Sequence, residues 1–345
     1  MTEQPFSVLV VGGGAGGLEL ACKLGRKWGS DRVALVDAKL FHIWKPSLHE
    51  VAAGTLDIHQ EGLSYQMLAH DNGFSFLYGP MVGLDAAGHS VVVGKVMDGP
   101  DEVLPERRIG YRTLVLAIGS VSNDFGVPGV VEHAFSLDGP TDAERFRLRM
   151  LQLLSLADVR KSHDPSAGLD IVIIGGGATG VELAAELREA SALHAQYGLR
   201  RIDASRDVRI RILEGAPRLL APLAEKVSAA ATRLLKQRHV EVNTSCRVVR
   251  IDADKVTDAD GNVYPAALCV WAAGIKAPPL LAQVGLPVTR GGQVTVDGQL
   301  RVEGVADVVA VGDCAWCPQP DGRSVPPRAQ SAHQQADYLY NLLLL

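Results

Sequence analysis

The sequence predicts an α/β fold with two parallel-sheet domains, and a repeated pattern carries that prediction. Near the N-terminus, the apolar stretch Ser7–Val11 runs into the glycine-rich segment GGGAGG at 12–17, and a helix follows. The same pattern returns 175 − 12 = 163 residues later, where Leu169–Ile174 runs into GGGATG at 175–180. An offset of that size is the length of a domain rather than a solenoid period, so two similar units are expected.

Both glycine runs match the pattern G-x-G-x-x-G, in which each glycine has a physical task. Gly12 permits a tight turn, Gly14 lets the backbone approach a pyrophosphate, and Gly17 lets the helix pack closely on the strand. A pyrophosphate would rest on the free N–H groups at the helix N-terminus. The same places in the second run are occupied by Gly175, Gly177 and Gly180. The sequence therefore predicts two Rossmann-like dinucleotide-binding domains.

An acidic residue ends the next strand in each unit. Asp37 lies 37 − 17 = 20 residues beyond the last glycine, the usual place for a carboxylate that accepts ribose hydroxyls. Glu214 lies 214 − 180 = 34 residues beyond, so a longer helix and loop are expected over about 181–207. Because a carboxylate binds a 2′-hydroxyl and repels a 2′-phosphate, Glu214 favours NADH over NADPH, whereas the nearby Arg218 could accept that phosphate.

The other elements are predicted from apolar runs and turn residues. Further strands are expected at 32–37, 75–78, 91–93, 113–119, 208–214, 268–273 and 305–313. Pro140–Lys161 is expected to form a long amphipathic helix with Thr141 as its N-cap and Glu144 three residues later. A linker at 164–168 follows, and a final helix is expected over Arg328–Leu345, after Pro326-Pro327.

Composition limits the class of protein. A chain of 345 residues with 47% hydrophobic and 21% charged residues is typical of a two-domain globular protein. The net charge of −5 argues against general nucleic-acid binding. No apolar run reaches the roughly 18–20 residues that cross a bilayer, and the N-terminus has no basic region followed by an apolar stretch. A cytoplasmic enzyme is therefore expected.

The five cysteines show no spacing typical of a disulfide framework. They are Cys22, Cys246, Cys269, Cys314 and Cys317. The last two form a C-x-x-C pattern, which leaves a redox pair or half of a metal site open, although a second C-x-x-C is absent from the sequence.

Two glycine patterns, strands that end at Gly119 and Gly274, and a late Gly312-Asp313 resemble the two-dinucleotide-binding-domain flavoproteins around the pyridine nucleotide–disulfide oxidoreductases. The resemblance implies that the first unit binds FAD, that the second, inserted unit binds NADH, and that Asp313 accepts a hydrogen bond from the FAD ribityl chain. The turns at 119 and 274 would connect the two domains. The FAD domain is then expected at 1–125 and 291–345, and the NADH domain at 126–290.

Three finer motifs resemble the type II NADH dehydrogenases. Phe41–Asp57 resembles the segment after their second strand, Val325–Ala336 resembles their quinone-site helix with its pattern AQxAxQ, and Glu182 matches a glutamate near flavin and nicotinamide. The resemblance runs from about Val8 to Leu345. It implies a non-proton-pumping NADH:quinone oxidoreductase of respiratory electron transport, which passes hydride from NADH to FAD and two electrons on to a quinone.

The same resemblance implies the site residues. The catalytic set is Glu182, Gln330 and Gln334. The cofactor-binding set is Gly12, Gly13, Gly14, Ala15, Gly16, Gly17, Asp37, Ala38, Lys45, Val82, Ala117, Gly119, Asp313, Ala329 and Gln330, with Gly175, Gly177, Gly180, Glu214 and Gly274. No metal is expected. From the residues alone, Glu182 could instead be a first-turn helix acid, the glutamines a solvated face, and Lys45 a surface lysine.

Other interpretations stay open. One is an NADH-dependent reductase of a small electron-transfer protein such as a ferredoxin or rubredoxin, and another is a flavin redox sensor that uses Cys314 and Cys317. Disulfide reductases and sulfide:quinone oxidoreductases are disfavoured because no cysteine lies between Cys22 and Cys246.

A quinone is the expected partner, and a homodimer is left open. The family usually continues beyond the quinone-site helix into a membrane-attaching segment, whereas this sequence ends at Leu345. Peripheral contact with the cytoplasmic face of the inner membrane is therefore expected only if such a segment exists.

Overall fold

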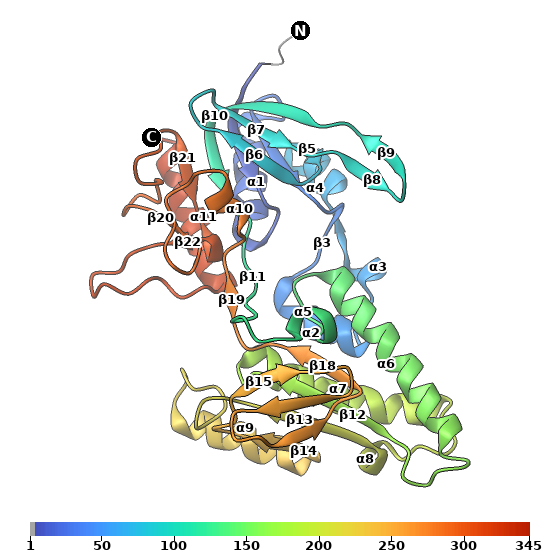
Figure 1. Ribbon diagram of the computed structural model, residues 1–345. Coiled ribbons are helices and arrows are strands. Elements are labelled where there is room, and N and C mark those ends of the chain that lie inside the picture. The colour runs from blue at the N-terminus through green and yellow to red at the C-terminus, as the bar shows by residue number, and fades with distance from the viewer. Residues whose placement is uncertain (1–3) are drawn as a thin grey trace. The chain divides into compact units, whose positions relative to one another are not determined.

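The computed structural model describes residues 4–345, which form two compact units (Figure 1). Unit 1 contains the chain up to Trp44, with Gly62–Val121 and Lys276–Leu345, and unit 2 contains Lys45–Glu61 and Ser122–Ile275. The chain passes between the units within β11 (Val121–Ser122) and within β19 (Ile275–Lys276), so most of unit 2 is an insertion in unit 1. The segment 45–61 groups with unit 2, and the cofactor-domain boundaries at 125 and 290 stay a prediction.

The sheet of unit 1 has the strand order β5-β2-β1-β10-β7-β6, and β21 also pairs with β10. Its parallel strands are β5 (Ser75–Tyr78), β2 (Val33–Asp37), β1 (Phe6–Val11), β10 (Arg107–Leu116) and β21 (Val308–Ala310). An antiparallel extension is formed by β7 (Ser90–Val93) and β6 (Met81–Asp85). Figure 1 shows the hairpin of β8 (Val96–Asp98) and β9 (Asp101–Leu104) continuing from β7 and β10.

Smaller elements complete unit 1. Its short strands are β3 (Phe41–His42), β4 (Leu63–Ser64), β20 (Val294–Thr295) and β22 (Ala315–Trp316). Its helices are α1 (Ala15–Trp28), α4 (Tyr65–Asn72), α10 (Leu280–Gln283), α11 (Ala329–Leu343) and the short 3₁₀ turn η2 (Gly312–Cys314). The helices α1 and α11 pack against each other, although more than 300 residues separate parts of them in the chain.

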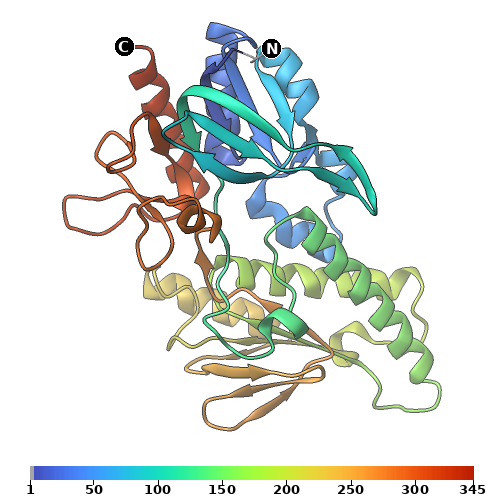
Figure 2. The ribbon, with the colours of Figure 1, turned by 45° about the horizontal axis from the view of Figure 1, so that its top comes forward.

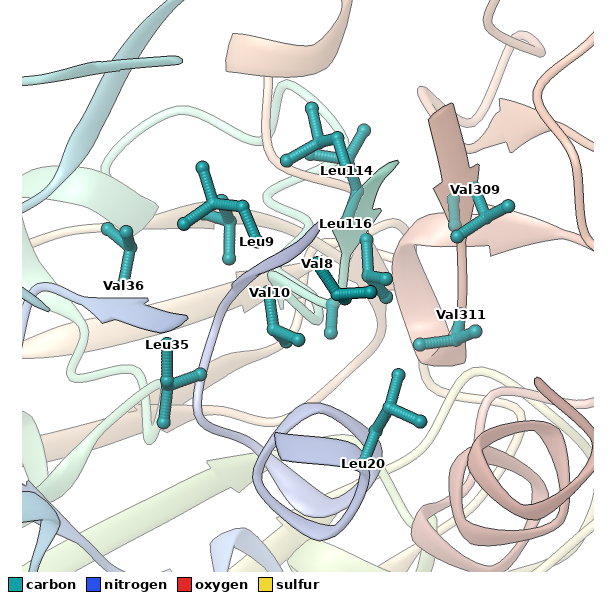
Figure 3. Packing of buried hydrophobic residues seen from close by; sticks show 14 of the residues in the cluster. Val8, Leu9, Val10, Leu20, Leu35, Val36, Leu114, Leu116, Val309 and Val311 are labelled. Atoms are coloured by element: carbon teal, nitrogen blue, oxygen red, sulfur yellow. The ribbon is translucent and has the colours of Figure 1, made fainter. Parts of the chain in front are cut away.

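The core of unit 1 explains the apolar runs in the sequence. Central strands of a parallel sheet are buried on both faces, so almost every residue in them is apolar. Val8, Leu9 and Val10 of β1 meet the side chains of β2 and β10, and Leu20 of α1 packs onto them (Figure 3). Fully burying one such side chain stabilises the fold by roughly 1.5–3 kcal/mol.

Unit 2 repeats this plan. Its parallel sheet has the order β14-β13-β12-β18, formed by β14 (Val240–Asn243), β13 (Val208–Leu213), β12 (Leu169–Ile174) and β18 (Leu268–Trp271). A three-stranded antiparallel sheet contains β15 (Val248–Ile251), β16 (Lys255–Asp258) and β17 (Val263–Pro265). Figure 2 shows the two long helices of the unit, α6 (Pro140–Arg160) in green and α7 (Ala178–Tyr197) in yellow-green. The other helices are η1 (Lys45–Ser47), α2 (Leu48–Ala53), α3 (Ile58–Glu61), α5 (Val130–His133), α8 (Ala204–Asp207) and α9 (Glu225–Gln237).

Several sequence predictions about element ends are wrong. The strand expected at 113–119 is β10, which begins at Arg107 and ends at Leu116, and the strand expected at 268–273 is β18, which ends at Trp271. The helix α6 begins at Pro140 with Gly139 as its N-cap, not Thr141, because proline has no N–H to lose and its fixed φ suits the first helical position. Glu144 therefore accepts hydrogen bonds from Arg147 rather than completing a capping box. The last buried strand is also shorter than 305–313, since the backbone turns at Gly312, where φ is +74°.

The prediction of a longer connection before Glu214 is confirmed. The helices α7 and α8 lie in the interval between Gly180 and β13. Among residues 4–345, no helix is both long and apolar enough to cross a membrane.

Candidate functional site

The expected FAD residues of unit 1 lie at the carboxyl ends of its parallel strands. Val11 of β1 pairs with Val36 of β2 and with Leu116 of β10, and Leu116 pairs with Ala310 of β21. The four strands therefore end level with one another. Their ends lead to Gly12–Gly17, to Asp37 and Ala38, to Ala117 and Gly119, and to Gly312-Asp313. Ligands of open α/β sheets bind at this edge.

The three glycines of the first pattern have three different surroundings. Gly12 has φ of +102°, and a Cβ built on it would lie 2.4 Å from the carbonyl oxygen of Ala117. A Cβ on Gly17 would lie 2.0 Å from the Gly12 carbonyl oxygen. A Cβ on Gly14 would meet nothing within 4 Å. Gly12 and Gly17 are thus required by the fold, whereas the space beside Gly14 is open for a ligand.

The second pattern repeats these surroundings closely. Gly175 has φ of +112°, and its Cβ would lie 2.4 Å from the Ala272 carbonyl oxygen. A Cβ on Gly180 would lie 2.0 Å from the Gly175 carbonyl oxygen, while one on Gly177 would meet nothing within 4 Å. The sequence repeat is therefore also a repeat of geometry, with one open cradle in each unit.

The N-terminus of α1 fits a bound pyrophosphate. Gly14 is its N-cap and is extended, with φ −71° and ψ −168°, and no side chain caps the helix. The first four N–H groups of a helix have no intrahelical partner. The first turn of α1, which the structure describes in full, contains Ala15 and Gly16 and carries no acid. The start of α1 thus offers N–H groups to an anion in the open space beside Gly14.

The two strand-end acids brace the glycine loops. Asp37 accepts hydrogen bonds from the Gly13 N–H at 2.6 Å and from the Lys39 N–H at 2.8 Å, one on each carboxylate oxygen. Glu214 accepts in the same way from the Gly176 N–H and, at 2.6 Å, from the Ala216 N–H. A carboxylate offers about four acceptor positions, so each acid retains capacity for ribose hydroxyls.

Arg218, the residue that could have accepted a 2′-phosphate, is engaged elsewhere. Its guanidinium donates to the carbonyl oxygens of Ala221 at 2.5 Å and Leu220 at 3.4 Å. Two of its five N–H donors are thus directed at backbone carbonyls.

Asp313 is held at the end of β21. Its carboxylate accepts a hydrogen bond from the Ser120 hydroxyl at 2.8 Å, and Ser120 follows Gly119 at the end of β10. The N–H of Gly312 donates to Oε1 of Gln335 on α11 at 2.7 Å. Ser120 and Gln335 were missed at the sequence level. Ser120 could have been found from its place in the turn at Gly119, whereas nothing local marks Gln335.

The helix α11 packs near the carboxyl ends of the unit 1 strands, and the contact is made by the small residue Ala332. A Cβ on Gly16 would lie 2.9 Å from the Ala332 carbonyl oxygen, and one on Gly312 would lie 3.4 Å from the Ala332 Cβ. Ala332 thus lies between the first fingerprint and the Gly-Asp turn. Ala329 is the first residue of α11, and Gln330 and Gln334 are exposed one turn apart. Their role at a quinone stays a prediction.

Glu182 lies where α2 packs against α7 within unit 2. Its Oε2 is 3.8 Å from Nδ1 of His49, and one turn on, Glu186 accepts a hydrogen bond from Thr55 at 2.6 Å. The alternative of a first-turn acid is wrong, because α7 begins at Ala178 and Glu182 is its fifth residue. About half of the Glu182 side chain is exposed, so its carboxylate is accessible to a ligand.

The remaining predicted residues have simpler surroundings. Lys45 is the first residue of η1, and it is not without a partner in the structure. Val82 lies on β6, four residues beyond the end of β5, and its side chain packs against Gly94. The Gly274 carbonyl oxygen accepts a hydrogen bond from the Asn123 N–H at 2.9 Å. Their cofactor contacts stay predictions.

All five cysteines are free. Cys314 is fully buried, its thiol lies within hydrogen-bond distance of the carbonyl oxygens of Val311 and Leu116, and burial raises its pKa to about 11. Burial also raises the pKa of Cys317. Thiols of this kind are protonated at pH 7 and react slowly. Within residues 4–345, no group of three or more His, Cys, Asp or Glu side chains is placed to hold a metal ion.

Comparisons with known proteins agree with this geometry. The family described as pyridine nucleotide-disulphide oxidoreductase matches residues 6–336. The chain is 38% identical to the type II NADH:quinone oxidoreductase of Haemophilus influenzae over 96% of this chain and 78% of that protein. It is 30% identical to the type II NADH:quinone oxidoreductase NdhA of Mycobacterium tuberculosis over 96% of this chain and 70% of that protein. The fold is similar to that of NDH2 from Plasmodium falciparum in complex with NADH, with a TM-score of 0.85, 19% identity, and coverage of 99% of this chain and 83% of that one.

Proposed function

The chain belongs to the pyridine nucleotide-disulphide oxidoreductase family and, within it, to the type II NADH:quinone oxidoreductases, and we propose that it works as an FAD-dependent, non-proton-pumping NADH:quinone oxidoreductase. The observation that carries the proposal is the 38% identity with a protein of that name along nearly the whole chain. The two open glycine cradles support it, because the reaction needs two dinucleotides at once.

FAD, when bound, supplies the redox chemistry by accepting hydride from NADH and passing two electrons to a quinone. The residues of unit 1 have binding tasks. The N-terminus of α1 beside Gly14 holds the pyrophosphate, Asp37 accepts the adenosine ribose hydroxyls, and Asp313 accepts from the ribityl chain. Ser120 supports Asp313 by donating to its carboxylate, which leaves the other carboxylate oxygen for the cofactor.

Unit 2 is the NADH side of the proposal. The cradle beside Gly177 takes the pyrophosphate, and Glu214 accepts the ribose hydroxyls. Two features support NADH over NADPH: the Glu214 charge would repel a 2′-phosphate, and two of the five N–H donors of Arg218 are directed at backbone carbonyls.

The quinone is assigned to Gln330 and Gln334 on α11, and the flavin–nicotinamide contact to Glu182. The exposed amides can donate to a quinone carbonyl as negative charge develops on it, a gain of roughly 0.5–1.5 kcal/mol per neutral hydrogen bond. The position of Ala332 between Gly16 and Gly312 supports this assignment, because it sets the start of α11 beside the first fingerprint.

The alternatives are less well supported. A redox sensor would need a reactive thiol, whereas Cys314 is buried with its pKa raised to about 11. A reductase of a ferredoxin or rubredoxin keeps the same two cradles, so only the choice of electron acceptor separates it from the proposal.

A cytoplasmic location, peripheral contact with the cytoplasmic face of the inner membrane, and a homodimer stay proposals. Co-sedimentation with anionic vesicles tests the membrane contact. Sedimentation velocity at micromolar protein concentration tests the dimer.

One experiment tests the function. The anaerobic protein should show a flavin spectrum that NADH bleaches and that a short-chain quinone restores. Reduction of a ferredoxin at a rate equal to that of the quinone would favour the alternative reductase. A flavin that NADH fails to bleach would contradict the proposal altogether.

A further inference from the structure

The residue that follows the first glycine of each pattern, Gly13 in unit 1 and Gly176 in unit 2, is held by its carbonyl oxygen as well as by its N–H, and the two units hold that oxygen differently. In unit 2, the Gly176 carbonyl oxygen accepts a hydrogen bond from the backbone N–H of Leu220 at 2.8 Å. In unit 1, the Gly13 carbonyl oxygen accepts from the Tyr65 hydroxyl at 2.8 Å and lies 2.9 Å from Nδ1 of His42. In unit 1, two side chains thus contact the carbonyl oxygen, whereas in unit 2 one backbone N–H donates to the equivalent oxygen.

The local fold brings both side chains to Gly13. The β3–β4 ladder pairs His42 with Leu63, two residues before Tyr65, and the Tyr65 N–H donates to the Leu40 carbonyl oxygen. Tyr65 is only 3% exposed, and its ring stacks on Phe76 with centroids 5.1 Å apart. A Cβ on Gly13 would lie 2.5 Å from the Tyr65 ring, so glycine is required here to admit the tyrosine.

The protonation of both groups suits this role. Burial raises the pKa of Tyr65 and lowers that of His42, so the tyrosine keeps its proton and the imidazole is neutral at pH 7. A carbonyl oxygen has no hydrogen to give, so Nδ1 of His42 must carry the hydrogen in this contact. Both groups are therefore donors.

The direction of the Gly13 carbonyl controls a donor of the ligand cradle. The peptide group between Gly13 and Gly14 is planar and trans, so its N–H, which belongs to Gly14, points opposite to its C=O. The Gly14 N–H belongs to the open cradle at the start of α1. We propose that Tyr65 and His42 are positioning residues for FAD, which hold the Gly13 carbonyl oxygen and thereby aim the Gly14 N–H at the FAD pyrophosphate.

This inference rests on the assignment of FAD to unit 1, and it goes beyond it by naming two residues outside the fingerprint. The inference also predicts that substitutions affect the ligand cradles of the two units differently. Changes to a side chain can loosen the FAD cradle, whereas the matching donor of the NADH cradle is the backbone N–H of Leu220, which every substitution except proline leaves in place.

The test uses the full chain freed of FAD, with Y65F as the main variant. It keeps the ring and its packing on Phe76 but removes the hydroxyl. Loss of one neutral hydrogen bond should raise the Kd for FAD about 2- to 12-fold. H42L should act in the same direction, and it keeps the test decisive if Y65F folds poorly. Y111F is the matched control, because the buried Tyr111 hydroxyl of unit 1 has no hydrogen-bond partner among the described residues.

A second readout separates aiming from packing. The ³¹P NMR resonances of FAD are recorded at saturating FAD in the absence of NADH. We expect Y65F and H42L to move a pyrophosphate resonance while Y111F leaves both in place, and we expect the NADH Kd to stay at the parent value in all three. A weaker FAD affinity with parent resonances would show a packing role only and would overturn the proposal, as would parent Kd and resonances in both variants. If the parent chain binds no FAD, the proposed function itself fails.

Discussion

Replacing Gly14 by alanine should remove FAD from the protein while leaving the fold intact. A Cβ at this position meets nothing within 4 Å, and the backbone angles of −71° and −168° suit any residue. The change should therefore cost little stability. The reduced freedom of the unfolded chain stabilises by about 0.4–1 kcal/mol, and alanine is a poorer N-cap than glycine by a similar amount.

The loss of FAD follows from what the methyl group would occupy. It would project into the open space where the pyrophosphate approaches the helix N-terminus. An extra methyl in a tightly filled space costs about 1–3 kcal/mol, and each 1.4 kcal/mol is a factor of ten, so the Kd for FAD should rise roughly 5- to 150-fold. Flavin fluorescence of the FAD-free chain measures the Kd, and thermal unfolding without FAD measures stability.

Two matched variants show whether the effect is specific to FAD and to the space beside Gly14. Gly177→Ala should weaken NADH binding and leave FAD in place, because Gly177 has the same open surroundings in unit 2. Gly17→Ala should instead prevent folding, because its Cβ would lie 2.0 Å from the Gly12 carbonyl oxygen. Parent FAD affinity in a folded Gly14→Ala variant would refute the assignment of the cradle.

Four further predictions concern single contacts. Asp313→Ala should lose FAD on purification, because its carboxylate is expected on the ribityl chain; stoichiometric flavin by absorbance would contradict this. Gln330→Ala and Gln334→Ala should slow flavin reoxidation by quinone roughly 2- to 12-fold in stopped flow and leave reduction by NADH unchanged; parent reoxidation rates would make α11 a structural helix only. Glu182→Ala should show the reverse pattern, with slower reduction by NADH. Glu214→Ala should lower kcat/KM for both NADH and NADPH, because it removes both loop contacts as well as the charge; parent kcat/KM with either cofactor would contradict this.

The sequence predicted the parts of the fold that local patterns specify. The central strands of both sheets and the long helices follow from apolar periodicity, and the cradles follow from glycine spacing. The end of a helix was less predictable. At α6, two local signals competed, and the fixed φ of Pro140 determined the start rather than the hydroxyl of Thr141.

Contacts between distant segments were not predictable. Tyr65 lies 52 residues from Gly13, and Gln335 lies 23 residues from Gly312, so no spacing rule connects them. In the sequence, Tyr65 looks like any aromatic residue of a hydrophobic core. Only the hydrogen bond of its hydroxyl to Gly13, which the structure shows, distinguishes it from such a residue. A fingerprint shows where a dinucleotide binds, but the groups that hold the fingerprint come from whichever segments the tertiary fold brings beside it.

The double use of Glu214 limits how cofactor preference can be changed. The carboxylate that is proposed to bind the ribose also accepts the Gly176 and Ala216 N–H groups, so alanine removes both loop contacts as well as the charge. Glu214→Gln removes the charge and keeps one acceptor oxygen, so it can accept from one of the two loop N–H groups, while its NH2 group can only donate and loses the contact with the other. Like charges about 4 Å apart repel by roughly 1 kcal/mol even in water, so the ratio of NADPH to NADH kcat/KM should rise at least about fivefold in this variant. Because Glu214→Ala loses the charge and both loop contacts, it should give poor activity with either cofactor, and the glutamine variant, which keeps one loop contact, is the better test of the charge.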